Sequence, residues 1–467
     1  MWFSVSMPLN SMASSLFDSF YYRSMFSTSA MAEDFSDEGR INAWLATEVA
    51  LAKGEARVGV IPKQAADNIA KAARLDNLDL QAMKAEFDKV GFPIMPLVHQ
   101  LAKACDPESA RWVHWGSTTQ DIVDTGLVLQ MRDGILLLEH DLEALITALA
   151  VLADKHRNTV MAGRTFQQQA APITFGYKVA VWLDELLRHQ ERLQELKKRV
   201  LVGQCGGAVG TLATLGEDGT AVRQAMMDEL GLGCPSITWH TARDGWAEMV
   251  NWLVLVCTSL GKVATEVATL MRTEVNEVRE PYQTGRGASS TMPQKRNPIA
   301  CPRIIAIAHR MREFSGAQFS AMIQEHERAV GAMPIEWMVI PEAFMLASGS
   351  FAQSLEILKN LEVDSTQMRA NLDLGGGLLM AEAVMMGIAP LIGRNQAHES
   401  VFAAAGRAND AGTTLREAIL DDEAIMQHIS AEQLDALLDP ANYTGSAGAM
   451  VDAVLVRAEV ALSGNGK

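Results

Sequence analysis

The feature that most constrains this chain is a set of long apolar stripes whose members recur every three or four residues. Four of these series are long enough to be amphipathic helices, and they run over residues 138–152, 179–200, 249–270 and 304–322. Helices of this length must bury their apolar stripes against one another. The sequence therefore predicts a central bundle of long helices and an all-α fold, with the Leu and Met stripes in the core.

Shorter helical patterns flank these long series, and no strand alternation of comparable strength or repeat of fixed period accompanies them. A chain of 467 residues is longer than one core usually fills, so we expect several domains. The breaks between periodic segments divide the chain into a disordered extension, an N-terminal helical domain, a central long-helix bundle and a C-terminal helical domain, at residues 1–15, 16–110, 111–360 and 361–467.

Composition excludes several classes of function. The formal net charge of −16 argues against a general nucleic-acid or anionic-membrane surface, so an anionic substrate needs a locally basic site. The five cysteines form no CxxC or Cys/His zinc spacing, which indicates a reducing, cytoplasmic setting without a disulfide framework. The most apolar stretch, residues 252–260, is too short to span a bilayer. We expect no membrane span, no metal and no organic cofactor.

One basic, glycine-rich segment, residues 284–298, has the residue types of an anion site. Paired hydroxyls at Ser289 and Ser290 are followed by Lys295 and Asn297, and no acid lies within the loop. We predict that Asn297 caps a helix whose first residue is Pro298. Positive charge beside a helix N-terminus suits an anion, and a glycine-hinged loop could close over it. A solvated basic surface loop would have the same composition.

The order of residues in this loop resembles a family signature. Residues 287–298, GASSTMPQKRNP, are similar to the loop of the fumarase/aspartase superfamily, written GSSxMPxKxNP. Residues 113–125 and 163–176 resemble the other two signature regions of that superfamily. The similarity extends from about residue 16 to the C-terminus. It is closest to the 3-carboxy-cis,cis-muconate cycloisomerases, and next to the adenylosuccinate lyases.

The resemblance implies a fold and an assembly. Members of the superfamily are three-domain helical proteins that form homotetramers with a twenty-helix core. Each active site collects the three signature regions from three different subunits. The resemblance also implies a small polycarboxylate substrate and chemistry through a carbanion that is delocalised into a carboxylate.

The resemblance further implies the roles of individual residues. Ser289 matches the catalytic base, and Lys295 matches the lysine that holds a substrate carboxylate and stabilises the dianionic intermediate. The residues that are expected to bind substrate are His114, Thr118, Thr119, Gln120, Arg164, Thr165, Phe166, Gln169, Arg243, Ser290, Met292, Asn297 and Arg328.

Three departures from the family pattern indicate which branch of the superfamily this chain resembles. Fumarases and adenylosuccinate lyases have a histidine where this chain has Phe166, and a partner glutamate where it has Pro302. Bacterial-type cycloisomerases also lack that pair and have an aromatic residue at the position of Phe166. They keep a histidine where this chain has Gln169, so the second region is unusually neutral.

Three functions remain open at this point. The favoured one is lactonisation of 3-carboxy-cis,cis-muconate, a step of aromatic catabolism. The second is a lyase on another polycarboxylate, either releasing fumarate from an N-substituted aspartate or decarboxylating an aconitate-like acid. The third is a scaffold without activity, against which the retained Ser289, Lys295 and Asn297 argue.

Overall fold

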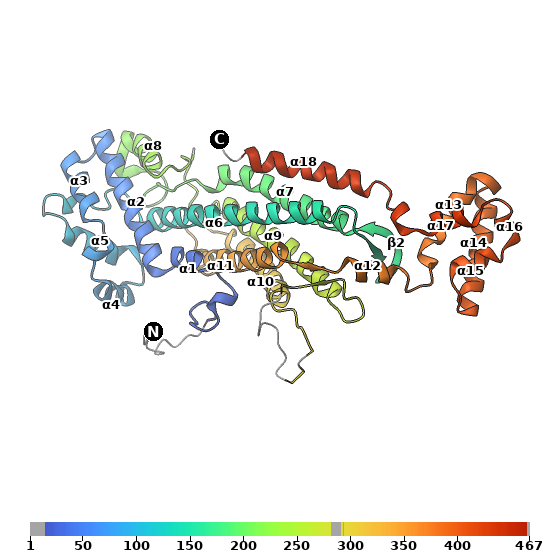
Figure 1. The fold of residues 1–467 in the computed structure, drawn as a ribbon. Coiled ribbons are helices and arrows are strands. Elements are labelled where there is room, and N and C mark those ends of the chain that lie inside the picture. Colours follow the sequence, from blue (N-terminus) through green and yellow to red (C-terminus); the bar gives the residue numbers. More distant parts are fainter. Residues whose placement is uncertain (1–14, 282–290, 293, 465–467) are drawn as a thin grey trace. The chain divides into compact units, whose positions relative to one another are not determined.

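The computed structural model describes residues 15–281, 291–292 and 294–464, and helices dominate this part of the chain (Figure 1). Eighteen α-helices and only four short strands occur among the described residues, which confirms the predicted all-α fold. The extension that we predicted over residues 1–15 lies, except for Ser15, outside the described residues.

The elements have the following bounds in chain order. The α-helices are α1 (Ser29–Asp34), α2 (Asp37–Val58), α3 (Lys63–Ala72), α4 (Leu80–Val90), α5 (Ile94–Ala104), α6 (Thr119–Lys155), α7 (Phe175–Val200), α8 (Gly219–Leu230), α9 (Asp244–Leu270), α10 (Ala300–Ala321), α11 (Ala332–Lys359), α12 (Ser365–Leu372), α13 (Ala381–Ile392), α14 (Arg394–Ala411), α15 (Leu415–Leu420), α16 (Glu423–Met426), α17 (Ala431–Leu438) and α18 (Ala447–Gly464). The short 3-10 helices are η1 (Arg23–Met25), η2 (Leu75–Asn77), η3 (Ala110–Trp112), η4 (Ala213–Asp218), η5 (Leu378–Met380) and η6 (Pro440–Asn442). The strands are β1 (Val160–Thr165), β2 (Gln168–Thr174), β3 (Val278–Arg279) and β4 (Glu362–Val363).

The four long apolar series fall in α6, α7, α9 and α10, as the periodicity predicted. Their stripe residues are buried, as Leu142, Leu149 and Val256 illustrate. Burial of one such side chain contributes about 1.5–3 kcal/mol, so these stripes carry much of the stabilisation of the fold. The series that was expected to reach residue 322 ends with α10 at Ala321.

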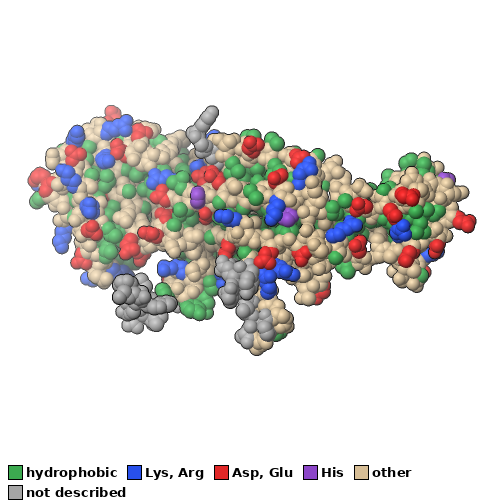
Figure 2. Space-filling model, in the orientation of Figure 1, with side chains coloured by type: hydrophobic (Ala, Val, Ile, Leu, Met, Phe, Trp, Pro, Cys, Tyr) green, Lys and Arg blue, Asp and Glu red, His purple; other side chains and the backbone are tan. Residues whose placement is uncertain are grey.

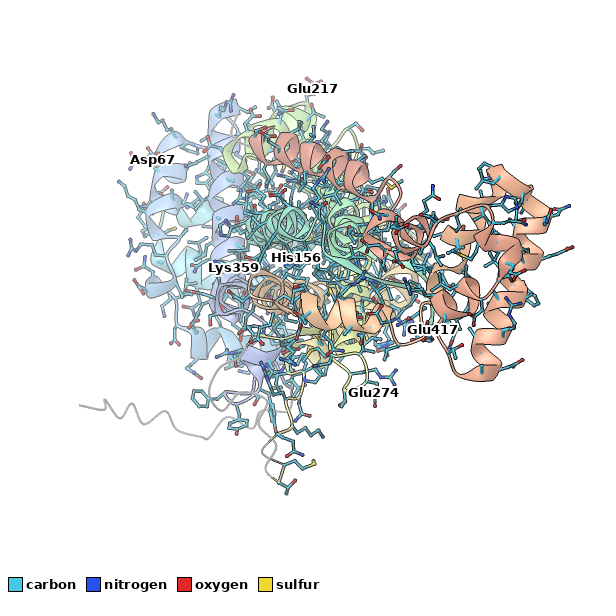
Figure 3. All side chains as sticks on the ribbon, turned by 45° about the vertical axis from the view of Figure 1, so that its right-hand side comes forward. Asp67, His156, Glu217, Glu274, Lys359 and Glu417 are labelled. Atoms are coloured by element: carbon cyan, nitrogen blue, oxygen red, sulfur yellow. The ribbon has the colours of Figure 1, made fainter. Side chains whose placement is uncertain are left out.

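A β-hairpin between α6 and α7 is a feature that the sequence patterns did not reveal. β1 and β2 pair in antiparallel register, and a bulge between Gly163 and Arg164 interrupts the alternation of side chains. His156, labelled in Figure 3, lies before the hairpin. Its ring packs edge-on against Phe175, the first residue after the hairpin, with the ring centroids 5.5 Å apart.

The described residues form two compact units. The first comprises the described residues of 1–141, 189–260 and 306–352, and the second those of 142–188, 261–305 and 353–467. In the first unit, α2 approaches the backbone of α8 so closely that a Cβ atom at Gly54 would lie 2.8 Å from the nitrogen of Met226. The division into three sequence-contiguous domains stays a prediction.

The C-terminal part of the second unit has an apolar core of its own. Val384, Ile388, Val401, Ile419 and Leu434 pack together within α13 to α17. Interhelical burial of this kind stabilises helices that would be too short to persist alone.

Charge and hydropathy of the surface agree with the composition. Acidic and basic side chains are intermixed over the face shown in Figure 2. Among the described residues, α9 alone is long and apolar enough to cross a membrane, and 56% of its apolar window is buried within the protein. Such burial is typical of a core helix.

Candidate active site

The first signature region, residues 113–125, leads into the first turns of α6, and one buried carboxylate organises it. Asp121, which is 1% exposed, accepts hydrogen bonds from the backbone N–H groups of Thr118, Gly206 and Gly207 at 2.9–3.1 Å. An acid at this helix position also interacts favourably with the helix dipole. The hydroxyls of Thr118 and Thr119 make no hydrogen bond to another described residue, which leaves them available to a ligand at this helix N-terminus.

Gln120 and Arg328, both expected to bind substrate, lie together in the first unit. Nε of Arg328 donates to the side-chain oxygen of Gln120 at 2.8 Å. The amide nitrogen of Gln120 donates to Asp124 at 3.1 Å and to the carbonyl oxygen of His240 at 2.9 Å. Its two N–H groups are therefore used within the protein, so direct substrate binding by Gln120 stays a prediction. Arg328 is exposed.

Arg243 has a structural task. Its guanidinium forms paired hydrogen bonds with Asp124 at 2.7 and 3.1 Å and also binds Glu336, with a shortest distance of 2.6 Å. The guanidinium also lies over the rings of Trp239 and Trp246, with 4.9 and 3.8 Å to their centroids. The side chain is fully buried, so in this structure it offers no surface to the substrate anion that the sequence led us to expect.

His114, another expected substrate ligand, precedes α6 in the left-handed region of backbone conformation, with φ of 60°. Its Nδ1 lies 2.6 Å from Oε1 of Glu48, whose side chain is fully buried in α2. Burial lowers the pKa of His114. The charge and hydrogen bond of Glu48, together with the charge of Asp121, raise this pKa by more than burial lowers it, so the net pKa lies above its usual value.

The second signature region forms the β1–β2 hairpin in the second unit. Arg164 donates to both carboxylate oxygens of the buried Glu277, at 2.6 and 3.0 Å. The amide of Gln169 donates to the carbonyl oxygen of Asn371, and the amide of Asn371 donates to Glu277. Arg164 and Gln169 are therefore brought together around one buried carboxylate.

The turn of this hairpin presents Phe166 to solvent. Phe166 and Gln167 both have positive φ, 50° and 66°. Positive φ at both loop residues is typical of the mirror-image turns that close hairpins with two-residue loops. Phe166 is 98% exposed, and Thr165 is also exposed. A phenylalanine in the left-handed region carries strain of the order of 1 kcal/mol, so this turn is an uncommon place for it.

The third signature region lies partly outside the described residues. Ser289 and Ser290 are not described, so their roles stay predictions. Met292 and Lys295 are exposed and joined by a hydrogen bond from the backbone N–H of Lys295 to the carbonyl of Met292, at 3.1 Å. Asn297 is half-buried.

The predicted start of the following helix is wrong by two residues, because α10 begins at Ala300 rather than at Pro298. The physical reason is the buried side chain of Glu280, which accepts the N–H groups of Ile299, Ala300 and Cys301 at 2.9–3.1 Å. The next residue, Pro302, has no N–H, so the first-turn donors are accounted for. This distant carboxylate fixes the chain where the loop ends and takes the capping role expected of Asn297.

Sequence reasoning missed the acids that support these regions, namely Glu48, Asp121, Glu277 and Glu280. A signal existed for Glu48, because it occupies a position among the apolar, core-facing residues of α2, near Leu45 and Leu51. Glu277 and Glu280 flank the two-residue strand β3, which no periodicity could reveal.

Three or more His, Cys, Asp or Glu side chains do not gather at any point of the described chain in a way that could hold a metal ion. The arrangement instead offers hydroxyls, amides and fixed cations, which are groups that bind carboxylates and stabilise developing negative charge.

Comparison with known proteins matches almost the whole chain. A family model described as Lyase matches residues 23–312, and one described as Adenylosuccinate lyase C-terminus matches residues 377–454. The 3-carboxy-cis,cis-muconate cycloisomerase of Pseudomonas aeruginosa is 44% identical over 95% of this chain and 96% of its own length. Trans-aconitate decarboxylase 1 of Mycosarcoma maydis is 39% identical over 93% of this chain and 88% of its own length.

Among solved structures, the 3-carboxy-cis,cis-muconate lactonizing enzyme from Pseudomonas putida has a TM-score of 0.90 and 40% identity, covering 94% of this chain and 99% of that chain. The fold, the signature regions and these relatives agree along the sequence. The chain belongs to the fumarase/aspartase superfamily of lyases.

Proposed function

We propose that this protein is a 3-carboxy-cis,cis-muconate cycloisomerase. The observation that carries the proposal is the end-to-end similarity to cycloisomerases at 44% identity, which includes the signature loop with Ser289, Lys295 and Asn297. The substrate is a conjugated diene with three carboxylates, and the product is a lactone.

The reaction is the family's β-elimination run in reverse. One substrate carboxylate oxygen forms a bond to an alkene carbon, and the electron pair of that alkene moves toward the neighbouring carboxylate. The resulting carbanion is delocalised into that carboxylate, and a proton then adds to its α-carbon. Ser289, which acts as the base in the elimination direction, donates this proton here. It becomes an alkoxide and then takes up a proton from solvent.

Several described residues suit such an anionic intermediate. Thr118 and Thr119 offer hydroxyl donors at the positive end of the α6 dipole. Lys295 supplies a fixed positive charge, which stabilises a dianion most where water is excluded. The hydrogen bonds that the Glu280 carboxylate accepts from the start of α10 hold the end of the loop that carries Lys295.

We further propose that the protein is a homotetramer whose active sites take the three signature regions from three subunits. The exposed phenylalanine at the hairpin tip supports this, because burying it against another subunit would recover about 2 kcal/mol. The long helices also expose large apolar side chains, namely Leu136, Val181, Leu255, Phe319 and Met338. A cytoplasmic location remains our proposal, and the five unpaired cysteines support it.

A lyase acting on another polycarboxylate is the second candidate. Gln169 stands where bacterial-type cycloisomerases have a histidine, and its amide, which donates to the carbonyl oxygen of Asn371, is too weak an acid to supply a proton. Decarboxylation of an aconitate-like acid would generate the same kind of carbanion. The similarity to the trans-aconitate decarboxylase supports this candidate.

The test is the loss of diene absorbance when the purified protein is mixed with 3-carboxy-cis,cis-muconate. We expect rapid loss, and a decrease in kcat of about a thousandfold or more in Ser289→Ala with its helical content unchanged. No loss with the wild-type protein would reject the cycloisomerase, and trans-aconitate and N-substituted aspartates would then be assayed. More than a few per cent of activity in Ser289→Ala would remove Ser289 as the proton-transfer group.

A further inference from the structure

The contact between His114 and Glu48 leaves one edge of the imidazole open. Glu48 is fully buried and binds Nδ1 at 2.6 Å, whereas the His114 side chain keeps 19% of its surface exposed. Nε2 of His114 makes no hydrogen bond with a described residue, and it is not among the buried, unpartnered atoms. The ring is therefore held from the inside by a carboxylate and can donate outward from Nε2.

The other titratable groups around this pair either bond to other residues or stay neutral. Asp121 binds Gly206, Gly207 and His240. Burial and, after it, the charge of Glu48 raise the pKa of Glu55 to about 9, so Glu55 keeps its proton at neutral pH. Burial is also the largest cause that raises the pKa of the nearby Cys205 thiol, which stays neutral. Glu48 is thus the carboxylate that directly balances a charge on His114.

The position of His114 in the sequence suits it to supply positive charge to the substrate site. His114 lies four residues before Thr118 and belongs to the first signature region. The second region lacks the family's histidine, because Phe166 stands there, and the partner glutamate that follows the third region is replaced by Pro302. A chain with a net charge of −16 that takes a tricarboxylate needs fixed positive groups at the site.

We propose that Glu48 is a positioning residue that holds His114 as an imidazolium, and that Nε2–H of His114 binds a carboxylate of the substrate. The identity of that substrate class rests on the proposed function. Without the negative charge of Glu48, burial would favour the neutral ring, whose outward nitrogen need not carry a proton.

The test compares Glu48→Gln with Glu55→Gln, a matched control two helical turns away on the same buried face of α2. Exchange of the histidine C2 hydrogen, followed by mass spectrometry, reports the pKa of His114. Calorimetry reports the Kd of propane-1,2,3-tricarboxylate, an unreactive probe. We expect Glu48→Gln to lower the pKa of His114 below its usual value and to weaken probe binding by about tenfold or more at pH 7. Glu55→Gln should change neither quantity.

An unchanged pKa of His114 or an unchanged Kd in folded Glu48→Gln would overturn the inference, as would absence of probe binding to the wild type. If Glu48→Gln fails to fold, His114→Gln replaces it, and an unchanged Kd in that variant would have the same meaning. Failure of the proposed function is a separate result. In that case the wild type binds the probe in a Glu48-dependent way but does not consume 3-carboxy-cis,cis-muconate.

Discussion

The first and second signature regions are built in opposite ways. Around Thr118 the chain folds inward, and the buried Asp121 gathers backbone N–H groups from two segments. The hairpin of the second region is anchored at its base by Arg164 and Glu277, but its tip exposes Phe166 almost completely. One region is completed by its own unit, and the other presents a strained apolar side chain with no cover in that unit.

This difference separates two kinds of cost. A buried carboxylate costs several kcal/mol unless hydrogen bonds and charges satisfy it, and the first region meets this requirement internally. An exposed phenylalanine forgoes about 2 kcal/mol of hydrophobic stabilisation, which only another molecule or subunit could recover. The comparison therefore predicts that mutations of buried groups in the first unit change stability, whereas mutations at the hairpin tip change activity.

The largest effect is expected at the two arginines that serve these regions. Arg243→Met leaves Asp124 and Glu336 buried without their cation, so we expect the free energy of unfolding to fall by about 4 kcal/mol. Arg164→Met leaves one carboxylate, Glu277, which still binds Asn371, and the expected loss is about 2 kcal/mol. Urea unfolding of both variants measures the two values. Equal losses, or a raised KM in a fully stable Arg243→Met, would break the comparison.

The next effect depends on pH and concerns Glu55. Its pKa is raised to about 9 in the folded protein, so between its unfolded pKa and pH 9 the folded state holds a proton that the unfolded chain releases. Stability must therefore fall as the pH rises through this window. Glu55→Gln has no such proton, so its stability relative to wild type should increase from pH 5 to pH 7.5 by about 3 kcal/mol.

Urea unfolding at several pH values measures this increase. Glu432→Gln serves as the control, because this acid is exposed in the second unit and its stability difference should hardly vary with pH. A difference for Glu55→Gln that does not grow with pH would show that Glu55 is ionised in the folded protein.

The smallest change in stability is expected at the hairpin tip. Phe166→Ala should alter the free energy of unfolding of the isolated subunit by less than about 0.5 kcal/mol, because the side chain has no contacts to lose there. In the assembled protein we expect kcat/KM to fall by about tenfold. Phe402→Ala, which removes another exposed phenylalanine ring, from α14, should leave kcat/KM unchanged. Equal effects of the two variants would reject a role for the tip.

The helices were predictable because their apolar periodicity extends over many turns. Each apolar position supports the same helical period independently of the others. The hairpin was not, because its strands are short, a bulge breaks their alternation, and its turn uses Phe166 and Gln167 rather than glycine or asparagine. The start of α10 also could not be predicted locally, since the carboxylate that caps it, Glu280, lies twenty residues before Ala300.

The site was predictable only through the resemblance to a family. The resemblance identified which residues belong to the site, but not which partners they bind. Resemblance selected Gln120, Arg243 and Arg328, but their tasks depend on partners that are distant in sequence. Arg243 is surrounded by Asp124, Glu336 and two tryptophans, and no spacing in the sequence predicts that enclosure. The role of Glu48 follows from its 2.6 Å contact with His114, which is 66 residues away along the chain.

The central claim is that an active site needs signature regions from different subunits, and subunit mixing tests it most directly. Ser289→Ala, expected to be inactive, and His114→Ala, expected to be impaired, would be assayed alone, then unfolded together, refolded as mixed assemblies and assayed with 3-carboxy-cis,cis-muconate. If the two regions come from different subunits, roughly a quarter of the sites contain both intact residues, and about that fraction of wild-type activity returns. A mixture that forms hybrid tetramers but stays inactive would contradict the account.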